Sequence, residues 1–139
     1  MNLKQKIIHI GLLILTLCIV NQTVSFSQAT DNDVKKAFIN ANADLLLPHL
    51  SEQITLNITG EELEISKSEA ASKINDFFDE HKVKNFSVKF EGSKSNSKFM
   101  IGTLFTEKGN FRINIFFKKE ANKEVIHNLR IEKDNESEF

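Results

Sequence analysis

The sequence predicts an α+β fold, in which two short strands and a four-stranded antiparallel meander form a sheet that packs against about three helices. Two periodicities support this prediction. Apolar residues recur at helical spacing in two segments before residue 82, whereas from Asn85 onward they alternate with polar residues, as in strands. Short polar turns separate the alternating segments, which is typical of an antiparallel meander.

The helical pattern marks two main segments. Residues 31–43 carry an apolar face, and a second short helical turn follows, bent at Pro48. The clearest helix start is at Ser66, because Glu69 stands three residues later and the two form a capping box. This helix is expected to end near His81. The predicted buried positions of these segments are Val34, Ala37, Phe38, Ala41, Leu45, Ala70, Ile74, Phe77 and Phe78.

Alternation predicts the strands. Two short ones lie at residues 54–58 and 63–65, joined by a turn at Thr59-Gly60, and four longer ones form the meander. One domain therefore covers residues 30–133, and residues 134–139 form a frayed tail. The predicted inward residues of the meander are Phe86, Val88, Phe90, Phe99, Ile101, Thr103, Phe105, Phe111, Ile113, Ile115, Phe117, Val125, His127, Leu129 and Ile131.

The first 29 residues have the features of a cleavable signal peptide. Lys4 and Lys6 form a basic start, and residues 7–20 are almost wholly apolar. This run is shorter than the roughly 20 residues that a membrane-spanning helix needs. The polar stretch that follows ends in Ser27-Gln28-Ala29, whose small residues suit signal peptidase, so cleavage is expected after Ala29. An uncleaved N-terminal anchor is the alternative; in either case the protein is exported, to the periplasm or the cell exterior.

The composition of the mature chain excludes several kinds of chemistry. Cys18 lies inside the apolar run and after Leu17, not after the small residue that lipid attachment requires, so the mature chain has no cysteine for a disulfide, a thiolate nucleophile or a metal. Without Lys4 and Lys6, 16 of the 18 basic residues remain against 19 acidic ones, a net charge of −3. This balance argues against nucleic acid as a partner. No association with the membrane is expected after signal removal.

The turns suggest a register for the meander. Pairing Phe105 with Phe111, and Phe117 with Val125, puts all the alternating residues on one face. The opposite face would then be too apolar to be wholly solvated, so we expect it to be covered by a second copy of the protein. The residues expected at this homodimer interface are Met100, Leu104, Phe116 and Ile126.

Three short stretches carry a resemblance to a known family. They are Gly102-Thr103 followed by a hydrophobic residue, the G-x-F-R pattern from Gly109 to Arg112, and LRIEK from Leu129 to Lys133. Over roughly residues 31–133 the chain resembles a family of small exported Bacteroidota proteins known as domain of unknown function 4783. The order of the elements is also similar to the nuclear transport factor 2-like fold. The resemblance implies a curved sheet wrapped around helices, and export; it brings no catalytic residues.

Four polar residues are candidates for a ligand site. His127 interrupts an otherwise apolar row, so its imidazole could contact a ligand or act as a general base; it could equally be a core-edge histidine bonded to the backbone, or lie in a bulge that faces solvent. Thr103 is a weaker candidate on the same face. Arg112 and Arg130 are expected to be cross-strand neighbours on the outer face, where they could bind an anion or could be balanced by Glu132.

The sequence lacks the groups of residues that catalysis usually requires. The predicted inward face of the meander has no Asp, Glu or Arg, and the chain has no tyrosine for the oxyanion hole of ketosteroid isomerases. His49, His81 and His127 are far apart, and no cofactor or metal is expected. We therefore expect a non-catalytic binding or interaction module, with room for a small-molecule pocket between sheet and helices. The alternative is a small isomerase- or hydrolase-like enzyme with His127 as its base.

Overall fold

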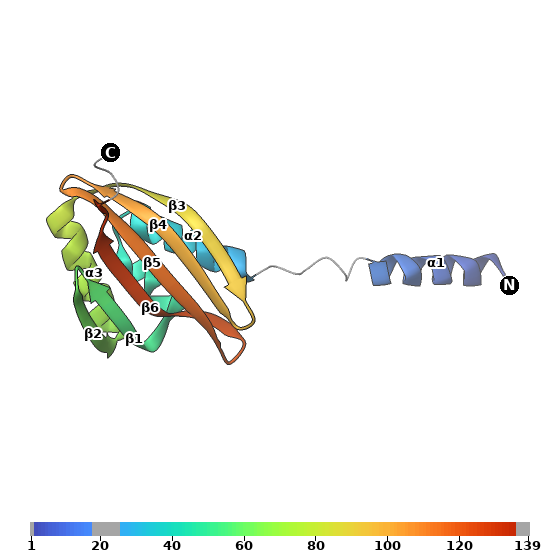
Figure 1. The fold of residues 1–139 in the computed structure, drawn as a ribbon. Coiled ribbons are helices and arrows are strands. Elements are labelled where there is room, and N and C mark those ends of the chain that lie inside the picture. Colours follow the sequence, from blue (N-terminus) through green and yellow to red (C-terminus); the bar gives the residue numbers. More distant parts are fainter. Residues whose placement is uncertain (1, 18–25, 136–139) are drawn as a thin grey trace.

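The computed structural model describes residues 2–17 and 26–135 and confirms the α+β class (Figure 1). The elements before the meander are α1 (Leu3–Leu17), α2 (Phe26–Ile39), the 3-10 helix η1 (Ala43–His49), β1 (Leu50–Ile58), β2 (Glu61–Ser66) and α3 (Lys67–His81). The meander consists of β3 (Val83–Lys94), β4 (Ser97–Thr106), β5 (Gly109–Glu120) and β6 (Lys123–Lys133).

The structure describes only part of the predicted signal peptide. Helix α1 ends at Leu17, and Cys18 lies outside the described residues. No helix in the described part of the chain is long and apolar enough to cross a membrane. Helix α2 begins at Phe26, so the predicted cleavage point after Ala29 falls within its first turn. The signal peptide and export remain predictions.

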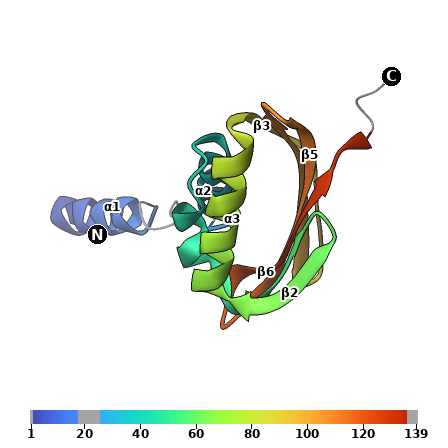
Figure 2. The same cartoon turned by 90° about the vertical axis from the view of Figure 1, so that its left-hand side faces the viewer.

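One six-stranded sheet with the order β2-β1-β6-β5-β4-β3 forms the body of the protein. All neighbouring strands are antiparallel except β1 and β6, which run parallel. Figure 2 shows the sheet curving around α2 and α3. We call the face toward these helices the inner face and the opposite face the outer face. The hydrophobic core lies between the inner face and the helices.

Local sequence signals explain where the helices begin and end. In α3 the predicted capping box is present: the Glu69 backbone N–H donates to Ser66 Oγ at 3.3 Å, and the Ser66 N–H donates to the Glu69 carboxylate at 3.2 Å. Helix α2 ends earlier than predicted, because Ala41 takes a positive φ of 50°. The turn directs Leu46 into the core and leaves Leu45 39% exposed, so the prediction that Leu45 is buried was wrong.

Aromatic side chains from both layers meet in the core. The ring of Phe38 in α2 stacks on the ring of Phe86 in β3, with 4.9 Å between the ring centres. It packs edge-to-face with Phe78 of α3, with 5.8 Å between the ring centres. Gly102 of β4 lies directly beneath Phe86, and a Cβ added there would be only 2.6 Å from the ring. The absence of a side chain at Gly102 therefore lets β3 and its phenylalanine pack closely on β4.

The buried side of β4 is opposite to the one predicted. Leu104, not Phe105, lies across from Phe111, so the register differs by one residue. Because strand side chains alternate between faces, this shift exchanges the two faces of β4. Met100 and Leu104 are fully buried on the inner face, and the prediction that they form an outer interface was wrong.

The turn between β4 and β5 accounts for this shift. The pair that closes the turn is Thr106 and Gly109, so the turn residues are Glu107 and Lys108, whereas the predicted pairing of Phe105 with Phe111 is centred on Lys108. Gly109 has a φ of 105°, which favours glycine, and the Thr106 hydroxyl donates to the Gly109 carbonyl at 2.7 Å. The hydroxyl bond and the glycine together fix where the strands begin to pair.

A β-bulge at His127 changes the predicted faces of β6. Phe116 pairs with Asn128 and Phe117 pairs with Ile126, which leaves His127 as the extra residue. Ile126 is therefore fully buried on the inner face, and its assignment to an outer interface was also wrong. Beyond the bulge, the predicted inward residues Leu129 and Ile131 are fully buried.

Candidate functional site

The four predicted ligand residues do not face the helices. Thr103 and Arg112 are direct cross-strand partners on the outer face, because their inner-face neighbours on β4 and β5 are the buried residues. Arg130 lies two strands from Thr103, and His127 lies at the bulge near the far end of the sheet. The structure thus brings together two of the four residues, on the face opposite to the predicted pocket.

Thr103 and Arg112 line an open hollow of ≈ 400 Å³ on the outer face. Its floor is apolar, and its rim carries a lysine, an arginine and an aspartate. We call this the outer hollow. Its lining residues are Lys89, Phe90, Ile101, Gly102, Thr103, Phe105, Asn110, Arg112 and Asp134.

The expected pair of arginines is not formed. Arg112 lies across from Glu132, and Arg130 lies across from Asn114, so the two guanidinium groups are displaced along the strands. Arg130 Nε is 3.5 Å from a Glu132 carboxylate oxygen, and the Asn114 amide donates to the other oxygen at 3.4 Å. Glu132 therefore balances the charge of Arg130, as one of the two alternatives predicted. The structure does not support an anion site formed jointly by Arg112 and Arg130.

His127 lies in a charged surface environment near Lys118 and Glu120. Partial burial and the positive charge of Lys118 lower the pKa of the imidazole, and the negative charge of Glu120 opposes them only in part. Glu120 itself is held by Lys118 and by the Ser51 hydroxyl, both at 2.9 Å, and these contacts lower the pKa of its carboxyl. None of the hydrogen bonds among the described residues involves the His127 ring, so no carboxylate orients it as a base.

Large apolar side chains are exposed on the outer face. Phe90 is 67% exposed, and Phe99 and Phe116 are each 37% exposed. Phe99 and Phe116 are cross-strand partners on β4 and β5, and the Phe99 ring lies over Gly92 of β3. Of the four predicted interface residues, Phe116 alone lies on this face. We call Phe90, Phe99, Ile101, Phe105 and Phe116 the outer apolar cluster.

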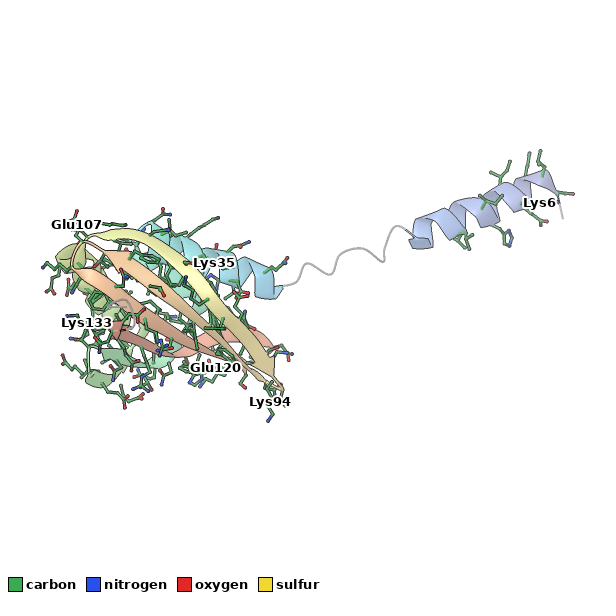
Figure 3. The ribbon with its side chains drawn as sticks, turned by 45° about the horizontal axis from the view of Figure 1, so that its top comes forward. Lys6, Lys35, Lys94, Glu107, Glu120 and Lys133 are labelled. Carbon is green, nitrogen blue, oxygen red and sulfur yellow. The ribbon has the colours of Figure 1, made fainter. Side chains whose placement is uncertain are left out.

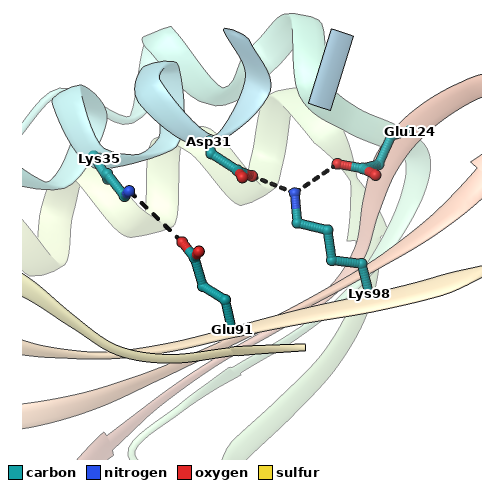
Figure 4. A network of polar contacts seen from close by, with 5 residues as sticks. All are labelled: Asp31, Lys35, Glu91, Lys98 and Glu124. Atoms are coloured by element: carbon teal, nitrogen blue, oxygen red, sulfur yellow. Dashed lines mark hydrogen bonds and ion pairs between the residues drawn. The ribbon is translucent and has the colours of Figure 1, made fainter. Parts of the chain in front are cut away.

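A partly buried charged network closes the other end of the inner face (Figure 4). Lys98 Nζ donates to the Asp31 carboxylate and, at 2.9 Å, to Glu124, and it lies 4.7 Å above the centre of the Phe117 ring. Burial alone would lower the pKa of Lys98, but the two carboxylates outweigh it and the net pKa is raised. This network ties the start of α2 to β4 and β6.

A second hollow, of ≈ 490 Å³, opens beside this network. Lys94, labelled in Figure 3, marks the β3–β4 turn at the same end of the sheet, whereas Glu107 and Lys133 mark the opposite end. Sequence reasoning missed the site because Lys98, Glu91 and Glu124 belong to the inner face only in the observed register. Among the described residues, no group of three or more His, Cys, Asp or Glu side chains could hold a metal ion.

Comparison with known proteins gives the family. The family model described as a domain of unknown function, DUF4783, matches residues 31–132. This chain belongs to the DUF4783 family. A crystal structure of a DUF4783 protein from Bacteroides uniformis shares 39% identity with it, covers 76% of this chain and 97% of its own, and has a TM-score of 0.72. A second one, from Bacteroides ovatus, shares 37% identity, covers 74% of this chain and 94% of its own, and has a TM-score of 0.71.

More distant structures confirm the predicted fold. A protein from Nostoc punctiforme with a cystatin-like fold is 16% identical and covers 84% of this chain and 82% of its own, with a TM-score of 0.65. A structure whose name marks it as an NTF2 variant, Rd1NTF2_05, is 11% identical and covers 76% of this chain and 95% of its own, with a TM-score of 0.60. The chain therefore has the nuclear transport factor 2-like fold. No curated protein matches the sequence. The family gives this DUF4783 protein a fold and close relatives, and leaves its function to be inferred from its surfaces.

Proposed function

We propose that this DUF4783 protein is an exported, non-catalytic binding module that binds through the outer face of its sheet, and that a second copy occupies this face in solution. The observation that carries the proposal is the outer apolar cluster. A phenylalanine that is 67% exposed, beside two others that are 37% exposed, forms an apolar surface that no described element covers.

The size of the outer face suits a dimer. Strands β3 to β6 have ten to twelve residues each, so they extend about 33–40 Å, and four strands span about 19 Å across. The resulting area of roughly 700 Å² is close to the ~800 Å² that each partner buries in a standard protein–protein interface. One sheet face is therefore large enough for a stable contact.

The charges on this face favour a copy of the same chain over a highly charged partner. Lys118 pairs with Glu120 at 2.9 Å, and Arg130 lies 3.5 Å from Glu132, so these positive and negative charges are balanced within one protein. Two such faces can approach each other without strong repulsion. In a symmetric dimer the same patch would serve both partners, as a two-fold interface requires.

Sedimentation equilibrium of the exported protein at tens of micromolar tests the proposal. We expect a dimer, and we expect Phe116→Glu to yield a monomer because it places a charge in the apolar cluster. Leu45→Glu is the matched control, since Leu45 has nearly the same exposure, 39%, but lies in η1. A wild-type monomer at these concentrations would contradict the proposal, as would a Phe116→Glu dimer as stable as the wild type.

Export is tested separately. The protein recovered from the periplasm or the medium should begin at Thr30, the residue that follows the predicted cleavage point. N-terminal sequencing measures this directly. Recovery of a chain that retains residues 1–29 in the membrane fraction would instead support the uncleaved anchor.

The enzyme alternative finds little support in this geometry. A base needs a neighbouring group that orients it. His127 lies in a bulge, outside both hollows, and no carboxylate within residues 2–17 and 26–135 is hydrogen-bonded to it. The lowered pKa of its imidazole reflects partial burial and the neighbouring lysine, both of which a surface histidine can experience without any catalytic role. The binding module is therefore the better-supported function.

A further inference from the structure

The outer hollow has a defined arrangement of side chains that the strand register fixes. Ile101, Thr103 and Phe105 follow one another on the outer side of β4. On β5, Arg112 lies directly across from Thr103 and Asn110 lies across from Phe105. Neighbouring side chains in such pairs have Cβ atoms about 5 Å apart, so they form one continuous surface. An apolar floor therefore lies beside a hydroxyl group and a guanidinium group.

A bulge in the edge strand builds the opposite wall. The register between β3 and β4 shifts between Val88 and Phe90, so Lys89 is an extra residue that has no partner on β4. Phe90 then lies across from Ile101 on the outer face and is 67% exposed. The bulge thus places an exposed aromatic ring and an adjacent lysine at the edge of the same hollow.

We propose that the outer hollow binds an organic anion that has an apolar body, such as a medium-chain carboxylate. Phe90, Ile101 and Phe105 would contact the hydrocarbon. Arg112 and Lys89 would hold the acidic group, since a guanidinium offers several N–H donors in a planar array and hydrogen bonds to ionised oxygens are the strong ones.

The charge and size of the hollow favour this ligand class. Its lining contains two cationic side chains, Lys89 and Arg112, and one carboxylate, Asp134, so the lining carries a net positive charge. The backbone N–H of Asp134 donates to the Asn110 carbonyl at 2.9 Å, which holds this residue at the end of the hollow that is farther from Lys89. A volume of ≈ 400 Å³ is within the ~300–1,000 Å³ range of small-molecule sites.

An NMR titration of the protein with octanoate, and in parallel with the uncharged octanol, tests this proposal. We expect octanoate to shift the backbone amide signals of residues 89–90, 101–105 and 112, and to bind more tightly than octanol. Arg112→Gln should weaken octanoate binding about tenfold, because a hydrogen bond to a charged group contributes at least roughly 1.5 kcal/mol. Arg130→Gln is the matched control on the same face and should bind octanoate as the wild type does.

The titration separates this proposal from dimer formation. Phe90, Ile101 and Phe105 belong to both the outer apolar cluster and the outer hollow, so a dimer would cover the hollow and weaken the apparent octanoate binding of the wild type. Phe116 does not line the hollow, so the Phe116→Glu variant should bind octanoate at least as tightly as the wild type, and its binding tests the ligand site independently of the dimer. Equal affinity for octanoate and octanol, unchanged affinity in Arg112→Gln, or shifts confined to residues outside the hollow would overturn the proposal. The amide spectrum of each free variant shows that it remains folded.

Discussion

The two faces of the sheet use the same strands in opposite ways. On β4, the inner residues Met100 and Leu104 are fully buried beneath the helices, whereas Phe99 on the outer face is 37% exposed. Both sets are apolar, and only the inner set has a cover within the described protein. The apolar residues of the inner face are therefore explained by folding alone, whereas the exposed apolar residues of the outer face are the basis of the proposed dimer.

The ends of the inner face add to this contrast. Near the middle, side chains such as Phe38 and Phe86 fill the space between the layers. At the open end, Lys98, Asp31 and Glu124 replace them with a compact charged network. The aromatic core fills the middle of the space between sheet and helices, which leaves the hollow beside the charged network and a smaller one of ≈ 160 Å³ between α3 and strands β1 and β2.

The largest expected effect comes from shortening an inner side chain. Leu104→Ala should lower the free energy of unfolding by about 2–5 kcal/mol, since it leaves a cavity in a fully buried site. Phe90→Ala, on the exposed face, should cost less than about 1 kcal/mol in dilute protein. Urea denaturation of both variants measures the difference. Similar losses for the two would show that the outer face is as well packed as the inner one.

A smaller loss is expected from the charged network. Lys98→Met leaves Asp31 and Glu124 facing each other without a cation and should cost about 2 kcal/mol near neutral pH. Lys35→Met, which breaks the half-exposed pair with Glu91, is the control and should cost less than about 0.5 kcal/mol. Thermal or urea unfolding of the two variants checks this order.

The Lys98 network also predicts a response to alkaline pH. The pKa of Lys98 is raised above its ordinary value of 10.5, so its contribution is complete below that pH and is lost as the pH rises through the raised pKa. Lys98→Met should lack this part of the alkaline loss. Equal alkaline loss in the wild type and the variant would show that the ammonium does not stabilise the folded state.

The smallest effect is expected at His127 on the outer side. Its pKa is lowered from 6.5, so the unfolded chain binds a proton more readily and stability should fall as the pH drops below about 6.5. His127→Gln should remove this slope and change stability at neutral pH by less than about 1 kcal/mol. Urea unfolding of the wild type and the variant between about pH 5 and 8 keeps most carboxylates ionised, and the difference between the two slopes gives the contribution of His127 apart from the other histidines. A steeper slope in the variant would contradict the assignment.

Several features could be predicted because they depend on neighbours in the sequence. The capping box at Ser66 and Glu69 fixed the start of α3, and the buried side of β5 was correct because its other side carries Arg112, Asn114 and Lys118. One polar and one apolar side leave a strand only one way to face the core. The order of the elements, and with it the family resemblance, rested on such local patterns.

The candidate site could be predicted only in part. Thr103 and Arg112 were singled out as separate candidates, and the structure places them side by side. The apolar walls of the hollow were missed, because Phe90, Ile101 and Phe105 were expected to face the helices. Nothing local distinguishes an apolar residue that will be buried from one that will be exposed on the other face of the same strand.

The amino-acid sequence by itself thus determined the α+β class, the start of α3 and the buried side of β5. Only the tertiary structure decided which side of β4 is buried, since Met100 and Leu104 compete with Phe99, Ile101 and Phe105 for the core. The turn at Gly109 accompanies a shift of one residue in the pairing of β4 with β5, which resolved that competition. The bulge at His127 separately changed which residues of β6 are buried. A one-residue shift moves every side chain of a strand to the other face, so a small change in backbone pairing determined which apolar side chains this protein exposes.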